Sequence, residues 1–429
     1  MTQIIYEIKS QPLIAAVTVI GTALAIFLMM VVVMLQQVKV IPIAPESDRD
    51  RMLYVSGVSF SYGPDDNPYY SSGNSKMASP IAQEFGEDLP GAEGTTVSQG
   101  SHESVLIAVA GQPSFETDMR QTDEKFFTVY SFRFLAGKSF DEADVKSHLP
   151  KVVISESVAR DTYGNADDAV GKELLIDEVP HTVTGVVADV SPVADHAYAQ
   201  VWVPIEETDP TDFWEQIGLG SYILAIKAES PDKFKEIGDE INRRVEIVKS
   251  RYSDKENFVY DIQGAPYTQA DETLHYGGSK PNPSAERRQR LIIYSILLLI
   301  PAINLSSMTR SRLRRRTSEI GVRRAFGCTR LRVITDILTE NFVITLAGSL
   351  IGLFACLIFG SLLFDAVFTG GWFTTYAVKA TVSFSSLLNW GMFAYAILFC
   401  FILNLLSTGI PAWRASRINP VEAINSSNR

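Results

Sequence analysis

The sequence is poor in cysteine, the residue that most often cross-links exported proteins. Only three of its 429 residues are cysteine, and all three lie in the last third of the chain: Cys328, Cys356 and Cys400. The stretch from 39 to 285 has none, which excludes intrachain disulfides there. An ordinary hydrophobic core must therefore stabilise this stretch.

The chain also lacks the residue patterns of common enzymes. Its five histidines do not pair at metal-ligand spacing, so we expect them on the surface: His102, His148, His181, His196 and His275. No nucleophile elbow or metalloprotease helix motif occurs. Residues Ala136 to Ser139 are not a phosphate-binding loop, because Phe132 stands where that loop needs its first glycine. We expect no catalytic residues, no bound metal and no cofactor in this chain.

Charge and hydropathy are distributed unevenly along the chain. Residues 39–285 carry 42 acidic and 21 basic side chains, which leaves the remainder at +10 because the whole chain is at −11. An acidic middle between apolar, basic-flanked ends predicts a soluble domain held at a membrane. We expect the adjacent acidic pairs to lie on a solvated face of that domain: Asp123-Glu124, Asp141-Glu142, Asp167-Asp168 and Glu206-Glu207.

Four apolar runs have the length of membrane-spanning helices, for which about 20 residues suffice: 12–35, 290–309, 333–364 and 387–410. The first run exceeds a signal-peptide core and no small-x-small cleavage site follows it, so we expect a retained anchor. The segments between the runs complete the predicted topology: a cytoplasmic N-terminus at 1–11, an extracytoplasmic domain at 36–289, a cytoplasmic loop at 310–332, an outer loop at 365–386 and a cytoplasmic tail at 411–429.

A basic loop between the second and third runs sets the orientation of the chain. From Met308 to Arg332 it carries nine arginines, and Glu319 is its only acid. Positive charge is retained on the cytoplasmic side, so both termini are predicted to be cytoplasmic. A patch for nucleic acid or anionic lipid is the alternative. The flanking apolar runs favour the membrane, so we expect lipid contacts and no nucleic acid.

The basic loop contains a predicted short helix over 317–326. Glu319 precedes Arg323 by four residues, the favourable order for a helical ion pair. Three apolar residues fall at i, i+3 and i+4 on one face: Val322, Ala325 and Phe326. Gly327 stands where a C-terminal cap belongs, and Thr329 is placed to cap a following long helix. A helix with one apolar and one basic face is suited to dock into a groove on a soluble partner.

The segment from Glu319 to Arg330 resembles the cytoplasmic signature of the FtsX-like, MacB-type ABC permeases. In that family this segment is the coupling helix that rests on the ATPase subunit. The resemblance implies an ATPase-coupling role for nine residues: Glu319, Ile320, Gly321, Val322, Arg323, Arg324, Ala325, Phe326 and Gly327.

The acidic middle predicts an α+β domain. Alternation and turn residues predict strands at 52–56, 105–110, 151–155, 173–177, 181–188 and 221–227, with 173–188 forming a hairpin. Capping residues predict helices starting at Ser79, Thr122 and Ser155, the last stopped by Gly164, and a helix over 230–247. Stretches rich in Gly, Pro, Asn and Ser predict loops at 62–79 and 267–284.

Four short motifs in this domain are similar in order and spacing to the MacB-type periplasmic core domain: Phe134–Asp141, Val152–Ser157, Ala169–Lys172 and Val183–Val187. Residues 411–424 resemble the closing motif of the same family. The resemblance implies a transmembrane domain of four helices, with a large α+β extracytoplasmic domain of two subdomains between helices 1 and 2. The inserted subdomain spans about 100–211. MacB carries its own N-terminal ATPase domain, whereas few residues precede the first apolar run here, so we expect the permease alone.

The resemblance implies a permease subunit of a MacB-type ABC complex in the bacterial inner membrane. It would pair with a second permease copy or paralogue and with two copies of a cytoplasmic ATPase, which would hold ATP–Mg. ATPase closure would move the coupling helix and the outer domain by mechanotransmission, and so drive export or release of a peptide, small toxin or lipoprotein. A periplasmic adaptor and an outer-membrane channel would accompany export.

Two alternatives remain open at this point. One is an FtsX-like regulatory permease that activates a periplasmic cell-wall hydrolase. The other is a non-transporting sensor with a ligand-binding outer domain. The sequence leaves open the cargo, the residues that contact it, and the choice between homodimer and heterodimer.

Overall fold

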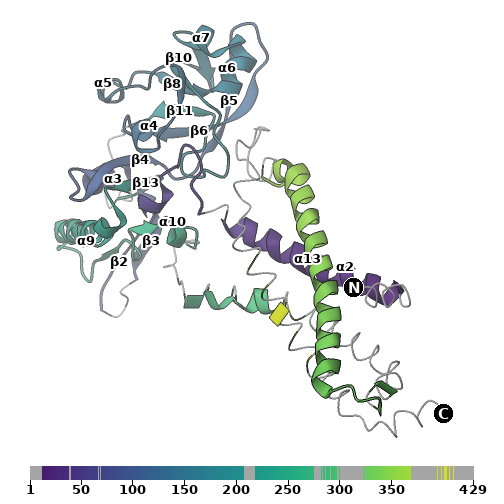
Figure 1. The fold of residues 1–429 in the computed structure, drawn as a ribbon. Helices are drawn as coiled ribbons and strands as arrows, with labels where there is room; N and C mark the ends of the chain where they lie inside the picture. Colours follow the sequence, from purple (N-terminus) through teal and green to yellow (C-terminus); the bar gives the residue numbers. More distant parts are fainter. Residues whose placement is uncertain are drawn as a thin grey trace. The chain divides into compact units, whose positions relative to one another are not determined.

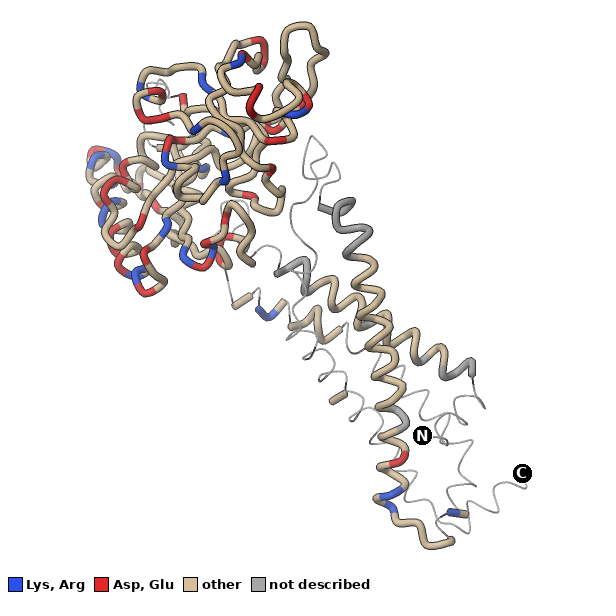
Figure 2. The backbone as a smooth tube through the Cα atoms, turned by 45° about the horizontal axis from the view of Figure 1, so that its top comes forward, with Lys and Arg blue, Asp and Glu red and all other residues tan. Residues whose placement is uncertain are grey.

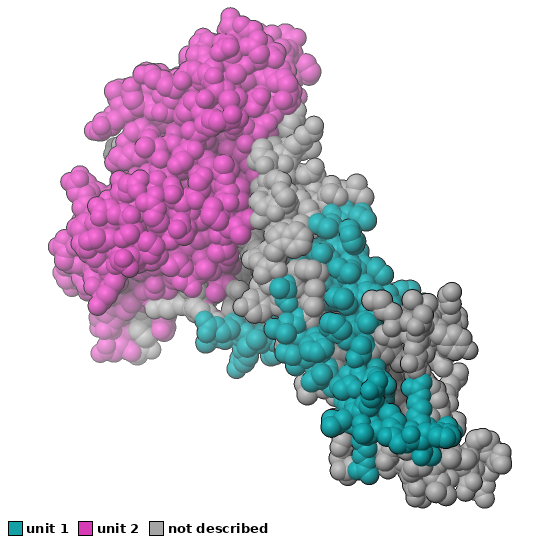
Figure 3. Space-filling model, viewed as in Figure 1, with its two compact units in different colours: residues 1–37, 284–363, 384–429 teal, residues 38–283, 364–383 magenta. Residues whose placement is uncertain are grey.

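A computed structural model describes residues 12–37, 40–65, 67, 69–206, 218–274, 282, 284–285, 287–289, 291–296, 299, 322–323 and 325–368, and the single positions 394, 398, 401, 402, 405 and 409. The chain forms two compact units, coloured separately in Figure 3. We call residues 1–37, 284–363 and 384–429 the helical unit, and residues 38–283 and 364–383 the sheet unit. Figure 2 shows charged residues spread over the sheet unit, whereas α2 and most of α13 carry none.

The helical unit is built around two long helices, α2 (Pro12–Gln37) and α13 (Arg330–Phe368). Among the residues that the structure describes, one helix is long and apolar enough to cross a membrane, at Arg330–Phe359 within α13. A shorter apolar helical stretch lies at Val19–Val32. The predicted runs at 290–309 and 387–410 fall largely outside the described residues, as do 1–11, 301–321, 369–393 and 410–429, so the four-helix arrangement stays a prediction.

The sheet unit contains a 15-stranded sheet with the order β11-β8-β10-β9-β5-β6-β4-β13-β3-β2-β14 (Figure 1). Its strands are β1 (Met52–Val55), β2 (Val58–Tyr62), β3 (Ser71–Met77), β4 (Ala92–Gln99), β5 (Glu103–Ala108), β6 (Phe115–Thr122), β7 (Phe134–Gly137), β8 (Lys151–Ser155), β9 (Glu173–Ile176), β10 (Val179–Val187), β11 (Val201–Pro204), β12 (Leu219–Gly220), β13 (Tyr222–Ala228), β14 (Val259–Asp261) and β15 (Tyr267–Thr268). Most neighbours pair antiparallel, while β10–β8 and β11–β6 are parallel.

Short helices border the sheet: η1 (Arg49–Arg51), α3 (Ser79–Gly86), α4 (Phe126–Val129), α5 (Glu142–Lys146), α6 (Glu156–Tyr163), α7 (Ala166–Ala169), η2 (Pro231–Lys233), α9 (Phe234–Arg251) and α10 (Gln269–Glu272). Helix α9 buries one apolar face, made by Ile237, Ile241, Val245 and Val248. These positions recur at helical spacing, which is why α9 can lie flat on the strands.

Three buried clusters form the core of the sheet unit. One joins the first and last parts of the unit, around Phe85, Leu224 and Tyr260. A second lies entirely within 105–203. The third, around Trp202, takes residues from both parts, including Tyr54 and Ala225. The predicted subdomain boundaries near 100 and 211 stay a prediction, because the sheet runs continuously through both parts.

Several predicted elements are confirmed. Strands β1, β5, β8 and β13 and the β9–β10 hairpin lie where alternation placed them, and Asp177 and Glu178 turn the hairpin with positive φ of 45° and 70°. At the start of α6 the Ser155 hydroxyl accepts from the Val158 N–H at 3.4 Å. Gly164 ends α6 with φ of +92°, a conformation that suits glycine.

Other expectations were wrong. Residues 62–79 are not all loop, because β3 runs through them. It pairs with β2, β12 and β13 despite its Gly, Asn and Ser content, so strand partners outweigh low propensity. Thr122 caps no helix: it ends β6, paired with Ser98 and Pro204, and α4 starts at Phe126. The Ser230 side chain makes no capping hydrogen bond, and α9 begins only at Phe234 after η2. Within 267–284, β15 and α10 form.

A buried ion pair fixes the loop that connects β10 to β11. Arg49 Nε lies 2.7 Å from Glu46 Oε2, and both side chains are buried. Arg49 Nη2 also donates to the Val193 carbonyl at 2.7 Å, while Glu46 Oε1 accepts from the Ala197 N–H at 2.8 Å. Residues near the start of the sheet unit thus hold a loop that lies about 150 positions later in the sequence.

The histidines are less exposed than expected. His148 is exposed, whereas His102, His181 and His196 are half-buried, and His275 lies outside the described residues. The His196 ring stacks on Tyr54 with 4.1 Å between the ring centroids. Among the described residues no group of three or more His, Cys, Asp or Glu side chains has a metal-binding arrangement.

Candidate functional site

The predicted coupling segment is described at five of its nine positions: Val322, Arg323, Ala325, Phe326 and Gly327. Glu319, Ile320, Gly321 and Arg324 lie outside the described residues. The Phe326 N–H donates to the Val322 carbonyl at 3.1 Å, as in an α-helical turn. The described part of the segment is therefore helical up to Phe326, as the spacing of its apolar residues predicts.

The helical turn ends in a glycine cap. Gly327 has φ of +93°, and the Cys328 N–H donates back to the Arg323 carbonyl at 3.0 Å. This six-to-one hydrogen bond with glycine at the left-handed position is the Schellman arrangement. No atom lies within 4 Å of a Cβ built on Gly327, so the backbone conformation, and not crowding, requires the glycine.

The apolar residues of the segment face outward. Phe326 is 88% exposed and Val322 is 42% exposed, and Ala325 is exposed as well. Leu331, four residues after the glycine cap, is 75% exposed. Burying a phenylalanine side chain contributes roughly 1.5–3 kcal/mol, and one left exposed beside further apolar groups is typical of a surface that contacts a protein partner or a membrane.

The predicted coupling segment leads directly into α13. Thr329 Oγ1 accepts from the Arg332 N–H at 3.3 Å, so the threonine caps the helix that begins at Arg330. The connection from Gly327 to Arg330 is short and held at both ends by hydrogen bonds. Only Cys328 and Thr329 thus separate the glycine cap from the start of α13.

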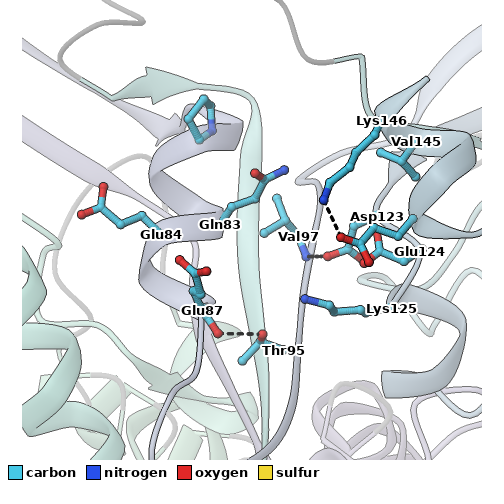
Figure 4. A pocket seen from close by; sticks show the side chains of 13 residues that line it. Gln83, Glu84, Glu87, Thr95, Val97, Asp123, Glu124, Lys125, Val145 and Lys146 are labelled. Atoms are coloured by element: carbon cyan, nitrogen blue, oxygen red, sulfur yellow. Dashed lines mark hydrogen bonds and ion pairs between the residues drawn. The ribbon is translucent and has the colours of Figure 1, made fainter. Parts of the chain in front are cut away.

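A second candidate site is a cleft of about 370 Å³ in the sheet unit (Figure 4). Helix α3 and strand β4 form one side of the cleft. Helix α5 and residues 123–125, which precede α4, form the other side. Carboxylates outnumber amines among its lining side chains: Glu84, Glu87, Asp123, Glu124 and Glu142 against Lys125 and Lys146. Lys146 pairs with Glu142 at 2.6 Å, and Glu84 pairs with Arg251.

Asp123 is the buried carboxylate of this cleft. Its side chain accepts from Thr96 Oγ1 at 2.5 Å and from the Val97 N–H at 2.7 Å (Figure 4 draws the second bond). Its own N–H donates to the Val97 carbonyl at 3.0 Å. Burial raises the pKa of Asp123 to about 7, although both hydrogen bonds to the side chain lower it.

The expectation that the adjacent acidic pairs are solvated is therefore wrong for Asp123. It holds for Asp141, Glu142, Asp167, Asp168 and Glu206, which are exposed, while Glu207 lies outside the described residues. Asp123 is buried because its backbone completes the pairing between β4 and the end of β6, which carries the side chain inward. Nothing in the dipeptide Asp123-Glu124 marks that difference.

These features define the class of protein: a chain with a long apolar helix, a separate α+β unit, and an exposed helical turn at the head of that helix. Residues 13–244 match the family described as MacB-like periplasmic core domain, and residues 291–420 match the FtsX-like permease C-terminal family. The first match alone spans more than half of the chain. The protein belongs to the MacB-like, FtsX-like family of ABC transporter permeases.

Curated relatives agree with this family. YknZ of Bacillus subtilis, described as an uncharacterized ABC transporter permease, is 21% identical over 86% of this chain and 84% of its own length. The macrolide export ATP-binding/permease protein MacB of Burkholderia lata is 26% identical over 70% of this chain. The match covers only 40% of that MacB, whose name includes an ATP-binding part.

Two solved structures are similar at low scores. The periplasmic region of MacB from Actinobacillus actinomycetemcomitans is 18% identical, with a TM-score of 0.31, over 48% of this chain and 88% of that one. The extracellular domain of YknZ from Gram-positive bacteria is 15% identical, with a TM-score of 0.31, over 48% of this chain and 99% of that one.

Family membership implies an inner-membrane permease with a periplasmic domain and a partner ATPase.

Proposed function

We propose that this chain is the permease subunit of a MacB-type ABC complex that transmits motion from a separate cytoplasmic ATPase to the sheet unit in the periplasm. The observation that carries the proposal is the exposed, capped turn at Phe326 and Gly327 at the head of α13. Its apolar side chains are left in water, while its backbone is fixed by hydrogen bonds at both ends of the connection.

The chemistry of the segment suits an ATPase groove with an apolar floor and an acidic rim. Val322, Ala325 and Phe326 supply the apolar contact, and Arg323 and Arg324 meet acidic side chains of the partner. Aromatic and arginine side chains are the residues that most often dominate the binding energy of an interface. Charge complementarity adds specificity for the cognate ATPase.

In the proposed assembly two permease copies work with two ATPase copies. ATP-driven closure of the ATPases displaces the coupling segments, the helices follow, and the sheet units change their relative position. Cargo in the periplasm, a peptide, small toxin or lipoprotein, is then pushed onward. The export activity in the name of the MacB relative supports export over activation of a cell-wall hydrolase.

Pull-down of the cognate ATPase tests the docking step. Phe326→Ala is expected to weaken ATPase binding about tenfold or more, because it removes an aromatic worth roughly 1.5–3 kcal/mol on burial. A double variant, Arg323→Glu with Arg324→Glu, is expected to abolish binding by placing like charges together. Both proteins are expected to insert in the membrane normally, since the changes lie outside the apolar runs.

Phe354→Ala is the matched control, because Phe354 is an exposed phenylalanine far along α13. It is expected to bind the ATPase like the wild type. Full ATPase binding by Phe326→Ala and by the double arginine variant would show that the segment only anchors the topology.

Adaptor and channel genes beside the permease gene would favour export, and a hydrolase that co-purifies with the complex would favour regulation.

A further inference from the structure

Two glycines of α13, one turn apart, lie where α2 comes closest. A Cβ built on Gly348 would stand 2.8 Å from Thr22 Cβ and 3.0 Å from the Val19 carbonyl oxygen. A Cβ built on Gly352 would stand 2.5 Å from the Ala23 carbonyl oxygen. These separations are shorter than van der Waals contact, so the observed approach of the two helices requires glycine at both positions.

The contact between the two helices continues beyond Gly352, towards the C-terminal end of α13. Between the two glycines, Ser349 is buried and its hydroxyl donates to the Thr345 carbonyl at 2.8 Å, so this buried polar group is paired within α13. Further along, the rings of Phe27 and Phe359 meet edge to face, with centroids 5.4 Å apart. Close packing of small residues drives helix association where surrounding lipid removes the hydrophobic driving force.

In the proposed mechanism, motion passes from the coupling segment to the sheet unit, and the two helices adjoin these two parts in the sequence. Helix α13 begins at the coupling segment, and α2 ends at Gln37, next to the start of the sheet unit at Val38. Since close-packed interfaces transmit strain instead of absorbing it, a joint without side chains between the helices is stiff. Motion that enters α13 at Thr329 therefore has a short path into α2.

We propose that Gly348 and Gly352 are positioning residues that lock α13 to α2, so that displacement of the coupling segment reaches the sheet unit through α2. The proposal rests on the proposed coupling function. The two helices move as one body during the ATPase cycle, and neither slides along the other.

A disulfide tests the contact itself. Thr22→Cys combined with Gly348→Cys is expected to cross-link on mild oxidation in membranes. Mass spectrometry would detect the disulfide-linked peptide. The Cβ separation of 2.8 Å must widen by only about 1 Å to reach disulfide geometry. Leu24→Cys with Ala355→Cys, both exposed, is the control pair and is expected to stay reduced. Equal cross-linking of the two pairs would contradict the contact.

Electron paramagnetic resonance tests the transmission. The complex with its ATPase is prepared in nanodiscs, and a ketone-reactive spin label is attached after Glu116→p-acetylphenylalanine, an exposed position on β6. ATP with vanadate is expected to shift the distance between the labels of the two permease copies. The oxidised Thr22→Cys/Gly348→Cys protein is expected to retain the shift, because the disulfide joins the two helices in place of the glycine contact. Its loss on cross-linking would mean that the helices must slide, which would overturn the proposal.

The complementary variants separate the helices. Gly352→Leu is expected to bind the ATPase as the wild type does and to lose most of the label shift, whereas Ala355→Leu is expected to keep both. Gly352→Ala, which adds only a Cβ, is expected to lose part of the shift and covers the case in which the leucine variant does not insert. A full shift in Gly352→Ala and Gly352→Leu would overturn the proposal. The proposed docking of the ATPase is tested separately, by measuring ATPase binding of the Phe326→Ala variant. A failure of docking can therefore be distinguished from a failure of the helix contact.

Discussion

The sheet unit and the helical unit reach stability by different means. The sheet unit encloses three apolar clusters and buries charges that are paired or hydrogen-bonded, such as Arg49 with Glu46. The described helical unit instead exposes large apolar side chains along α13, including Phe354 and Ile358, and its helices touch through glycine. One unit is stabilised by its own interior, whereas the other depends on an apolar environment around it.

We predict that the sharpest contrast between the units is the compartment that each faces. An impermeant thiol reagent applied to intact cells is expected to label Glu116→Cys in the sheet unit and to leave native Cys328, beside the coupling segment, unmodified. Positive charge around Cys328 is the physical reason to expect it on the cytoplasmic side. Cys328 should react only after permeabilisation, which mass spectrometry of the labelled peptides would show. Labelling of Cys328 in intact cells would reverse the predicted orientation.

Breaking the buried ion pair is expected to have the largest effect on the stability of the sheet unit. Arg49→Met leaves the Glu46 carboxylate buried without its cation, which costs roughly 3–5 kcal/mol in comparable cases. Urea unfolding of the full chain in detergent, followed by tryptophan fluorescence, would measure the shift of the sheet-unit transition. Lys146→Ala removes the exposed pair with Glu142 and is expected to change stability by no more than about 1 kcal/mol. Equal effects would contradict the distinction.

The buried Asp123 predicts a pH dependence that is confined to the sheet unit. Because its pKa is raised from 3.8 to about 7, the folded protein holds a proton that the unfolded chain releases. The stability from this group is present below pH 4 and falls as the pH rises towards 7, by roughly 2–3 kcal/mol between pH 5 and 7. Asp123→Asn should remove that slope in urea unfolding, and Glu124→Gln, at the next position, should keep it. An unchanged slope in Asp123→Asn would refute the assignment.

The helix cap at the head of α13 is expected to give the smallest effect. Thr329→Ala removes the hydroxyl that accepts from the Arg332 N–H and costs about 1 kcal/mol of helix-end stability. If docking needs an ordered first turn, ATPase binding should weaken roughly fivefold. Thr329→Ser keeps the hydroxyl and should bind normally. Loss of binding in both variants would assign the effect to the threonine methyl group.

Elements whose sequence signal lies entirely in their own residues were predicted. Strands β8 and β13 are mostly apolar, and the caps at Ser155, Gly327 and Thr329 are chemical features of single residues. Such signals do not depend on contacts with residues that are distant in the sequence. The hairpin of β9 and β10 belongs with them, because its turn residues are adjacent in the sequence.

Features that depend on distant partners were not predicted. Strand β3 is polar and forms only because β2 on one side, and β12 and β13 on the other, offer backbone partners. Asp123 is buried by the strand beside it, 26 positions earlier in the sequence. The spacing of Gly348 and Gly352 was present in the sequence as a helix-packing signal. Its partner on α2 lies more than 300 residues away, so the spacing alone did not identify the contact.

The length of α13 has a mechanical consequence. At 39 residues the helix is about 58 Å long, nearly twice the thickness of a bilayer core. A rod of that length, tilted by about 5° around one end, carries its other end through about 5 Å. In the proposed mechanism, a small rotation at the ATPase would thereby be enlarged with distance along the rod. Under the proposed lock, α2 joins this rod at Gly348 and Gly352, so moving the glycine pair by one turn would change the displacement that is passed to α2 without altering either end of α13.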